Sequence, residues 1–195
     1  MAALIDVPAI RALLARAYFD DPLTEWIFPD PTTRLDATAA WYGLYAEQYV
    51  TGAQATLVPS DGALSAMALW RRATDGHLSP DGVPSIAGLL AALVGTSRAE
   101  AIGAALHSIG SLVPTEPHVY LNFLAVSPHR QRSGLGRQAI EPVLAAADED
   151  GQFVHLETTN PANYEFYERL GFVETGRVRL GEGGPELRAM RWDAG

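Results

Sequence analysis

The residues best suited to chemistry lie in one glycine- and arginine-rich segment, between an expected strand and an expected helix. The first N–H groups of a helix have no partner within the helix and attract anions, and two glycines would let a diphosphate approach without a Cβ in the way. A tight, solvated turn is the alternative, although one glycine would suffice for it. We interpret the segment as an anion cradle, and its residues are Arg130, Gln131, Arg132, Ser133, Gly134, Leu135, Gly136 and Arg137.

The same segment matches the permissive dinucleotide-binding pattern through Gly134, Gly136 and Ala139, with Glu157 as the acid expected further on. In the dinucleotide fold the glycines follow the strand almost at once, whereas residues 127–133 intervene here. The chain after Glu157 is also too short for the further strand-helix-strand units of that fold. We therefore disfavour dinucleotide binding.

The chain from residue 118 onward predicts alternating strands and helices around the cradle. Two apolar runs, HVYLNFLAV and QFVHLETT, each predict a strand, and a helix follows the cradle between them. The run NPANYEFYERLG predicts a short helix that ends at Gly171, which suits a left-handed C-cap. FVETGRVRL and ELRAMRW predict two closing strands around a Gly- and Pro-bearing turn. The predicted order is therefore β-α-β-α-β-β.

The chain before residue 112 predicts helices and one hairpin. Asp6 is the expected N-cap of a helix that ends near Phe19, and a Ser-Asp-Gly turn joins two strands within residues 52–72. Aromatic residues gather between Trp26 and Tyr49, where they either line an acceptor pocket or, more simply, pack in the core. The other expected elements are a helix over 35–50, a loop over 73–85 and helices over 84–95 and 98–111.

Two motifs carry a family resemblance. The segment LAVSPHRQRSGLGRQAI resembles the acetyl-CoA signature of the GNAT family of N-acetyltransferases, with Gln131, Gly134 and Gly136 at its key positions. NPANYEFYERLGF resembles the later family segment, with Asn160 and Tyr167 in place before a closing Gly-Phe. Two motifs in the correct order are more specific than either alone. The layout of the N-terminal half is similar, more loosely, to the puromycin N-acetyltransferase-like branch.

The resemblance implies an α/β, GNAT-like fold. Its mixed, mostly antiparallel central sheet of about six strands would splay between HVYLNFLAV and QFVHLETT, with helices on both faces. We expect one N-acetyltransferase domain over 1–195, with a variable acceptor-side half at 1–112 and an acetyl-CoA-binding half at 118–192. Only five residues precede Asp6, so the customary first strand is nearly absent and the sheet is expected to lack an edge strand.

The resemblance also implies how acetyl-CoA would be held and cleaved. Backbone groups of Phe123, Leu124, Ala125 and Val126 would pair with its pantetheine arm and help to polarise the acetyl carbonyl. Tyr167 would be the general acid that protonates the leaving thiolate. Packing within the short helix is the alternative role for that tyrosine.

Four further polar residues have candidate roles. Asn160 would hydrogen-bond the pantetheine or serve only as a turn residue. Glu157 ends a strand and is the candidate general base, directly or through water, with a solvated carboxylate as an equal alternative. His118 is a weaker base candidate, and His129 is a turn residue or a phosphate contact. The expected catalytic residues are thus Tyr167 and Glu157.

The composition of the chain limits which classes of partner and cofactor are expected. Fourteen Lys and Arg against twenty-three Asp and Glu give a net charge of −9, which disfavours nucleic acid and is compatible with a cationic amine. The chain has no cysteine for disulfides or thiolate sites, and no His or carboxylate grouping has metal-ligand spacing, so no metal is expected. The N-terminus lacks signal-peptide features and no apolar run is long enough to span a membrane, so a cytoplasmic protein without membrane contact is expected.

The favoured function is acetyl-CoA-dependent acetylation of the amine of a small molecule by direct attack, with an antibiotic or an aminonucleoside among the candidate acceptors. CoA and the amine are the expected partners, and a homodimer is included among the expected assemblies. Two rivals remain open: a non-catalytic acyl-CoA-binding regulatory module, and acetylation of a protein or peptide amine. Both Tyr167 and Glu157 are present, which argues against the non-catalytic module.

Overall fold

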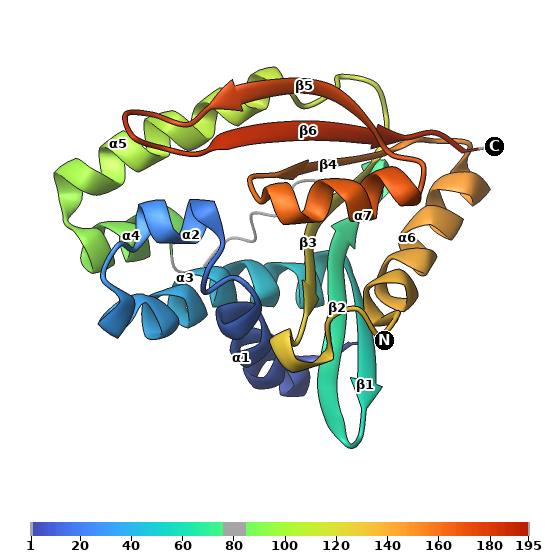
Figure 1. The fold of residues 1–195 in the computed structure, drawn as a ribbon, viewed down its shortest axis with the longest axis horizontal. Helices are drawn as coiled ribbons and strands as arrows, with labels where there is room; N and C mark the ends of the chain where they lie inside the picture. Colours follow the sequence, from blue (N-terminus) through green and yellow to red (C-terminus); the bar gives the residue numbers. More distant parts are fainter. Residues whose placement is uncertain (1, 76–84, 195) are drawn as a thin grey trace.

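Six strands form one mixed sheet in the order β1-β2-β3-β4-β6-β5 (Figure 1). The computed structural model describes residues 2–75 and 85–194. Neighbouring strands are antiparallel except β3 and β4, which are parallel. This arrangement confirms the predicted α/β fold with a mixed, mostly antiparallel sheet. The strands are β1 (Gln54–Ser60), β2 (Ala63–Arg71), β3 (Val119–Val126), β4 (Val154–Thr158), β5 (Val173–Arg179) and β6 (Glu186–Trp192).

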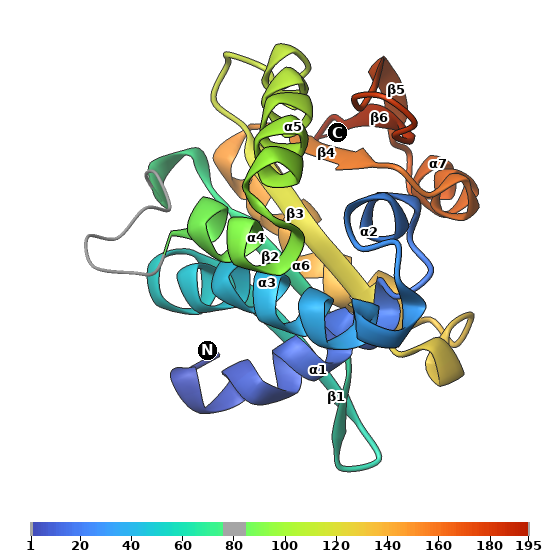
Figure 2. The same cartoon turned by 90° about the vertical axis from the view of Figure 1, so that its left-hand side faces the viewer.

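Helices cover both faces of the sheet, as predicted. One apolar cluster joins α1, α3, α4 and α5 to one face of β2 and β3, and a second joins α6 and α7 to the opposite face (Figure 2). The helices are α1 (Val7–Ala17), α2 (Pro22–Ile27), α3 (Pro31–Gly52), α4 (Ile86–Val94), α5 (Thr96–His107), α6 (Leu135–Asp150) and α7 (Tyr164–Arg169). Short 3-10 turns occur at Leu4–Asp6, Ala73–Asp75, Ser108–Ser111, Pro128–Arg130 and Pro161–Asn163.

Two Asp-Pro pairs start helices where the sequence analysis placed irregular chain. Asp21 caps α2 by accepting a hydrogen bond from the backbone N–H of Leu23 at 3.0 Å, with Pro22 at the first helical position. Asp30 caps α3 in the same way, so this helix begins at Pro31 rather than near residue 35. Proline at the first helical position needs no N–H there, and the preceding aspartate supplies the missing acceptor. An Asp-Pro pair in the sequence can therefore mark the start of a helix as well as a turn.

The start of the chain differs from expectation in one detail. Asp6 occupies the N-cap position of α1, but its carboxylate accepts a hydrogen bond from the N–H of Ala3 at 2.8 Å and caps nothing within α1. Among the described residues no strand precedes α1, and β1 of the hairpin forms that edge of the sheet. Most of the predicted loop over 73–85 and the first residue of the helix predicted over 84–95 lie outside the described residues.

A bulge in β3 decides which side chains face which core. The β2–β3 register shifts by one residue, which leaves Asn122 as the extra residue on β3. Side chains alternate along a strand, so an extra residue exchanges the two faces. Accordingly Leu121 packs in the α6 core before the bulge, and Phe123 packs in the α1 and α3 core after it.

The two parallel strands separate directly after a short paired region. Val119–Leu121 of β3 pairs with Val154–Leu156 of β4, and no pairing between these strands extends beyond Leu121 and Leu156. The β4-facing backbone edge of β3 is therefore free of strand partners from Asn122 onward. This is the splay that the sequence analysis expected between these two strands.

Candidate active site

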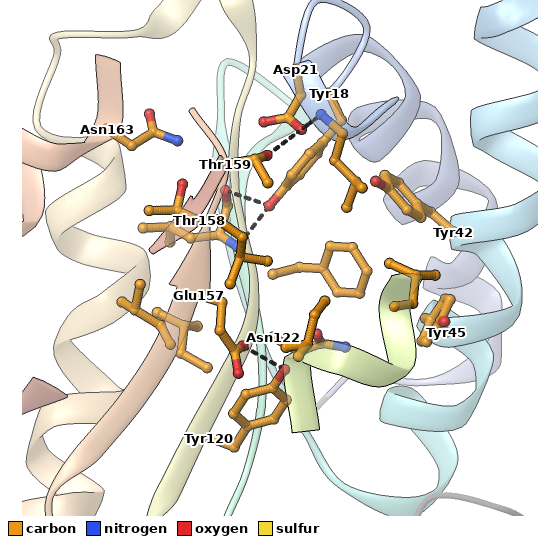
Figure 3. Close-up of a pocket in the computed structure, with 18 of the residues that line it drawn as sticks. Tyr18, Asp21, Tyr42, Tyr45, Tyr120, Asn122, Glu157, Thr158, Thr159 and Asn163 are labelled. Atoms are coloured by element: carbon orange, nitrogen blue, oxygen red, sulfur yellow. Dashed lines mark hydrogen bonds between the residues drawn. The ribbon is translucent and has the colours of Figure 1, made fainter. Parts of the chain in front are cut away.

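A cavity of about 430 Å³ lies beside the splay (Figure 3). Its walls come from β3 and β4, from α3, from the end of α1 and from the chain around Ile109. The lining contains both aromatic and polar side chains. The aromatic residues are Tyr18, Trp41, Tyr42, Tyr45, Tyr120, Phe123 and Tyr167, and the polar ones are Asp21, Asn122, Glu157, Thr158, Thr159 and Asn163.

Glu157 on β4 presents a carboxylate to this cavity, and both of its oxygens have partners. The hydroxyl of Tyr120 donates to Oε2 at 2.8 Å, as Figure 3 shows, and Nε2 of His155 lies 2.8 Å from Oε1. The Glu157 side chain is only 6% exposed and that of His155 is fully buried. Burial and proximity to Glu157 raise the pKa of Tyr120 well above its usual value, so the phenol stays protonated and donates.

Tyr18 reaches the backbone that the splay leaves free. Its hydroxyl lies 3.3 Å from both the N–H and the carbonyl oxygen of Leu124. The ring packs edge-on against Tyr42 and Phe123, with centroids 5.4 and 5.8 Å apart. Burial raises the pKa of Tyr18 well above its usual value, which leaves a neutral hydroxyl at the centre of the splay.

Asp21 is a second buried carboxylate at the edge of the cavity. Its Oδ1 accepts hydrogen bonds from the N–H of Leu23 at 3.0 Å and from the hydroxyl of Thr159 at 3.1 Å. Burial raises the pKa of Asp21, and the hydrogen bonds from Leu23 and Thr159 oppose that shift only in part. A negative charge here is therefore less stable than on an exposed aspartate.

Tyr167 comes from α7 and borders the same cavity. It is buried, and its ring packs edge-on against Phe166 and Phe172 with centroids 5.2 and 5.5 Å apart. Burial, followed by the nearby charge of Asp21, raises the pKa of Tyr167 above its usual value. Tyr167 is therefore a protonated phenol at neutral pH, facing the same space as Glu157.

The anion cradle lies at the N-terminus of α6, beyond the end of β3. Gly134 precedes the helix with a φ of +86°, a conformation that favours glycine, and a Cβ there would meet nothing within 4 Å. A Cβ on Gly136 would lie 3.4 Å from Phe166 and from Val126, so this glycine serves close packing. Arg130 forms an ion pair with Asp61 of the β1–β2 turn.

Comparison with known proteins places this fold and these motifs in a family. A profile of the acetyltransferase (GNAT) family matches residues 15–172. The chain belongs to the GNAT acetyltransferase family. The family consists of acetyltransferases, and enzymes of this fold use acetyl-CoA and an amine acceptor.

Individual relatives agree with the family. An uncharacterized N-acetyltransferase of Schizosaccharomyces pombe is 34% identical over 61 residues, which span 31% of this chain and only 25% of that protein. A Corynebacterium glutamicum structure described as histone acetyltransferase HPA2 and related acetyltransferase has a TM-score of 0.74 and 24% identity over 100% of this chain and 94% of its own. Arylalkylamine N-acetyltransferase 2 of Aedes aegypti has a TM-score of 0.65 and 13% identity over 98% and 95%. At these identities the two structures show the shared GNAT fold.

The structure brings the two expected catalytic residues of this GNAT enzyme to one cavity, together with Phe123 and Leu124 of the expected pantetheine edge, and leaves Asn160, His118 and His129 outside its lining. Glu157 and Tyr167 both line it, whereas Asn160 accepts a hydrogen bond from the N–H of Ala162 at 3.0 Å and so caps a turn. Nδ1 of His118 lies 2.7 Å from the carbonyl oxygen of Glu116, at the far end of β3 from the cradle. His129 is in the exposed turn that leads to the cradle.

Several residues in or next to the cavity were missed from the sequence. His155 and Glu157 alternate on a strand, and this spacing alone could have placed both on one face. Asn122 is the extra residue of the β3 bulge, and Tyr120 lies two residues before it. No sequence motif predicted this bulge. Tyr18 follows α1 and carries no local signal of its role.

The described residues contain neither a metal-binding group nor a membrane-spanning helix. No group of three or more His, Asp or Glu within residues 2–75 and 85–194 is arranged to hold a metal ion. No helix in the same ranges is both long and apolar enough to cross a membrane.

Proposed function

We propose that this enzyme transfers an acetyl group from acetyl-CoA to the amine of a small molecule whose body is apolar or aromatic. The observation that carries the proposal is the cavity beside the splay, which combines a buried carboxylate with an aromatic wall. A cavity of about 430 Å³ suits a compact ligand, since small-molecule sites typically measure roughly 300–1,000 Å³.

The acetyl-CoA site would combine the cradle and the free edge of β3. The first N–H groups of α6 and the nearby Arg132 and Arg137 would bind the diphosphate, with Gly134 keeping the approach open. Backbone groups of Leu124, Ala125 and Val126 would pair with the pantetheine arm. Gln131 and Ser133 would complete the cradle.

Glu157 would act as the general base. The amine nitrogen attacks the thioester carbonyl carbon, the C–N bond forms, and a carboxylate oxygen of Glu157 takes the proton that leaves nitrogen. The C–S bond then breaks and its electron pair goes to sulfur. A base held inside the cavity by two donors is already oriented for this step.

Tyr167 would act as the general acid. Its phenol is neutral at the working pH because burial raises its pKa, so its proton is available to the departing thiolate. One proton taken by Glu157 and one given by Tyr167 leave the products balanced as an amide and free CoA thiol. Proton exchange with solvent then restores both residues.

The aromatic wall supports a flat or apolar acceptor. Trp41 and Tyr42 stack with centroids 5.2 Å apart, and Tyr45 packs edge-on against Trp41. Ammonium groups and aromatic bodies both interact favourably with such rings. Aminonucleosides of the puromycin type belong in the acceptor panel because of the looser resemblance of the N-terminal half.

The test measures binding and turnover separately. Calorimetric titration with acetyl-CoA and with CoA gives binding, and thiol release over a panel of arylalkylamines, polyamines, aminonucleosides and peptide N-termini gives turnover. Tyr167→Phe is compared with Tyr164→Phe. The control also removes one phenol hydroxyl, but from a residue one helical turn earlier that does not line the cavity. We expect Tyr167→Phe to lower kcat by about 100-fold, at the lower end of what a general acid contributes.

Each result separates the candidate functions. Turnover of arylalkylamines or aminonucleosides that falls in Tyr167→Phe supports the proposal. Turnover of peptide N-termini alone would replace it with protein acetylation. Binding of acetyl-CoA without turnover of any amine would indicate a regulatory module, and absence of acetyl-CoA binding would refute the proposal altogether.

A further inference from the structure

We propose that His155 is a positioning residue for the base: together with Tyr120 it holds Glu157 as an oriented carboxylate inside the acceptor cavity. The inference rests on the proposed function, in which Glu157 takes the proton of the amine, and it adds a second residue through which that base works. No motif contains His155, and it is absent from the cavity lining.

The geometry gives each carboxylate oxygen one donor. Tyr120 reaches Oε2 and His155 reaches Oε1, both at 2.8 Å. Two donors on different oxygens fix the plane of the carboxylate, and a carboxylate oxygen still has a further lone pair for the substrate proton. A glutamate side chain that was free to rotate would lose this alignment in most of its rotamers.

The hydrogen bonds around His155 set its tautomer. A carboxylate accepts only, so Nε2 of His155 must carry a proton and donate to Glu157. Its Nδ1 is buried and has no partner within the described residues. Because His118 donates from Nδ1 to the carbonyl of Glu116, its own Nε2 is a bare, buried acceptor as well.

The aromatic surroundings keep the imidazole in place. His155 stacks on Tyr120 with centroids 5.8 Å apart at 19°, and meets His118 edge-on at 5.5 Å. Tyr120 thus makes two contacts: its ring stacks on His155, and its hydroxyl binds the same carboxylate as His155 does. Rigid support of this kind is what orients the direct partners of a reacting group in other sites.

Charged and titratable groups from several elements lie close to His155, Tyr120 and Glu157. Arg71 of β2 lies over the ring of Tyr120, with its Cζ 5.2 Å from the centroid. Tyr49 of α3 has its pKa raised by burial, with Glu157 among the charges acting on it. The groups to consider in any pH profile are therefore Arg71, Tyr49, His118, Tyr120, Glu157 and, opposite His155 on β6, Arg191.

The experiment compares two replacements of the same histidine. His155→Gln keeps an N–H donor near the position of Nε2 and removes the titratable ring, whereas His155→Leu removes the donor. His107→Leu, on the exposed end of α5, is the control for histidine loss. Each variant is measured for kcat, for KM of amine and acetyl-CoA, for the pH profile of kcat/KM and for acetyl-CoA binding by calorimetry.

We expect His155→Leu to lower kcat by about 10- to 100-fold, as for other residues that orient a reacting group, while acetyl-CoA binding is unchanged. The shape of its pH profile of kcat/KM changes as well, because the donor that orients the carboxylate is gone. His155→Gln recovers most of the rate and the parent pH profile. His107→Leu behaves as the parent protein.

Two rate outcomes would overturn the inference. One is a His155→Leu variant with the parent kcat. The other is a loss that is equal at every pH and not recovered by Gln in a folded variant, since that pattern marks packing alone.

A measurement without turnover keeps the inference separate from the proposed function. Histidine labelled with ¹⁵N reports which ring nitrogens carry protons, and we expect a protonated Nε2 at His155 that is perturbed in Glu157→Gln. A bare Nε2 would refute the positioning role. If the parent protein binds acetyl-CoA and acetylates no amine, the proposed function fails while this spectrum still decides the role of His155.

Discussion

Residues 118–192 and residues 1–112 form two walls of one cavity, and the C-terminal wall supplies most of its polar residues. The C-terminal half contributes Glu157, Tyr167 and the free edge of β3, all attached to the sheet or to α7. The N-terminal half contributes Tyr18 and a largely aromatic surface from α3. In the proposed function, the C-terminal wall would carry out the steps that are the same for every acceptor, and the N-terminal wall would contact the body of the amine. We infer that the first half sets the reaction and the second sets the choice of substrate.

Glu157→Gln should give the largest effect, because it removes the proposed base from the C-terminal wall and leaves the shape of the side chain unchanged. General bases contribute roughly 10²- to 10⁴-fold, so we expect kcat to fall by a factor in that range with acetyl-CoA binding retained. Thiol release and calorimetry measure the two quantities. Glu100→Gln on the exposed face of α5 is the control.

A Glu157→Gln variant with near-parent kcat would show that solvent or another group takes the amine proton. The division of labour between the walls would then fail on its C-terminal side. A large loss of acetyl-CoA binding would instead assign Glu157 to the architecture of the splay.

How far the sequence could predict this molecule follows the same division. Gly134 and Tyr167 lie in motifs that can be recognised in a single sequence. The motif around Gly134 reflects a local backbone requirement, a φ of +86° before α6. Tyr18 meets Leu124 across 106 positions of sequence, and Tyr120 meets Glu157 across 37. Such contacts depend on how helices dock on the sheet and on a one-residue bulge, and no local pattern encodes them.

Tyr45→Leu tests the N-terminal wall. The ring packs edge-on against Trp41 and Phe123, with both centroids 5.7 Å away, and leucine keeps an apolar side chain in its place. Losing an aromatic contact of about 0.5–1.5 kcal/mol should raise the KM of an aromatic amine by roughly 2- to 13-fold. Steady-state kinetics on aromatic and aliphatic amines measures the change.

Acetyl-CoA affinity and kcat should stay near the parent values in Tyr45→Leu, because the residue lies away from the cradle. Equal losses for aromatic and aliphatic amines would contradict an aromatic acceptor. A weaker affinity for acetyl-CoA would contradict the separation of the two walls.

Gly134→Ala tests whether the cradle depends on backbone conformation. An alanine at a φ of +86° costs about 1–2 kcal/mol, although its Cβ meets nothing within 4 Å. Gly183→Ala is the matched control, because Gly183 has a φ of +66° and the same open surroundings in the β5–β6 turn. Urea unfolding should show similar losses for both variants, and only Gly134→Ala should raise the KM of acetyl-CoA. Equal KM values would remove Gly134 from the binding site.

Asp21→Asn gives the smallest expected effect and concerns stability at the junction of the two walls. Burial raises the pKa of Asp21, so the folded state binds its proton more tightly than the unfolded chain does. The stability that this proton gives is complete below the unfolded pKa near 3.8 and is lost as pH rises through the folded value. An asparagine stays neutral, and its Oδ1 can still accept from Leu23 and Thr159.

We therefore expect Asp21→Asn to raise the free energy of unfolding at pH 7 by on the order of 1 kcal/mol, with no gain at pH 3. Asp30→Asn provides the opposite sign, because hydrogen bonds from Thr32 lower the pKa of this exposed cap. Its contribution is present above the unfolded pKa and lost as pH falls, so its replacement should destabilise the protein at pH 7. Urea unfolding at both pH values measures the two variants. If Asp21→Asn lost stability at pH 7, the carboxylate would have a partner beyond Leu23 and Thr159 that offsets its burial, and the junction would be a charged part of the site.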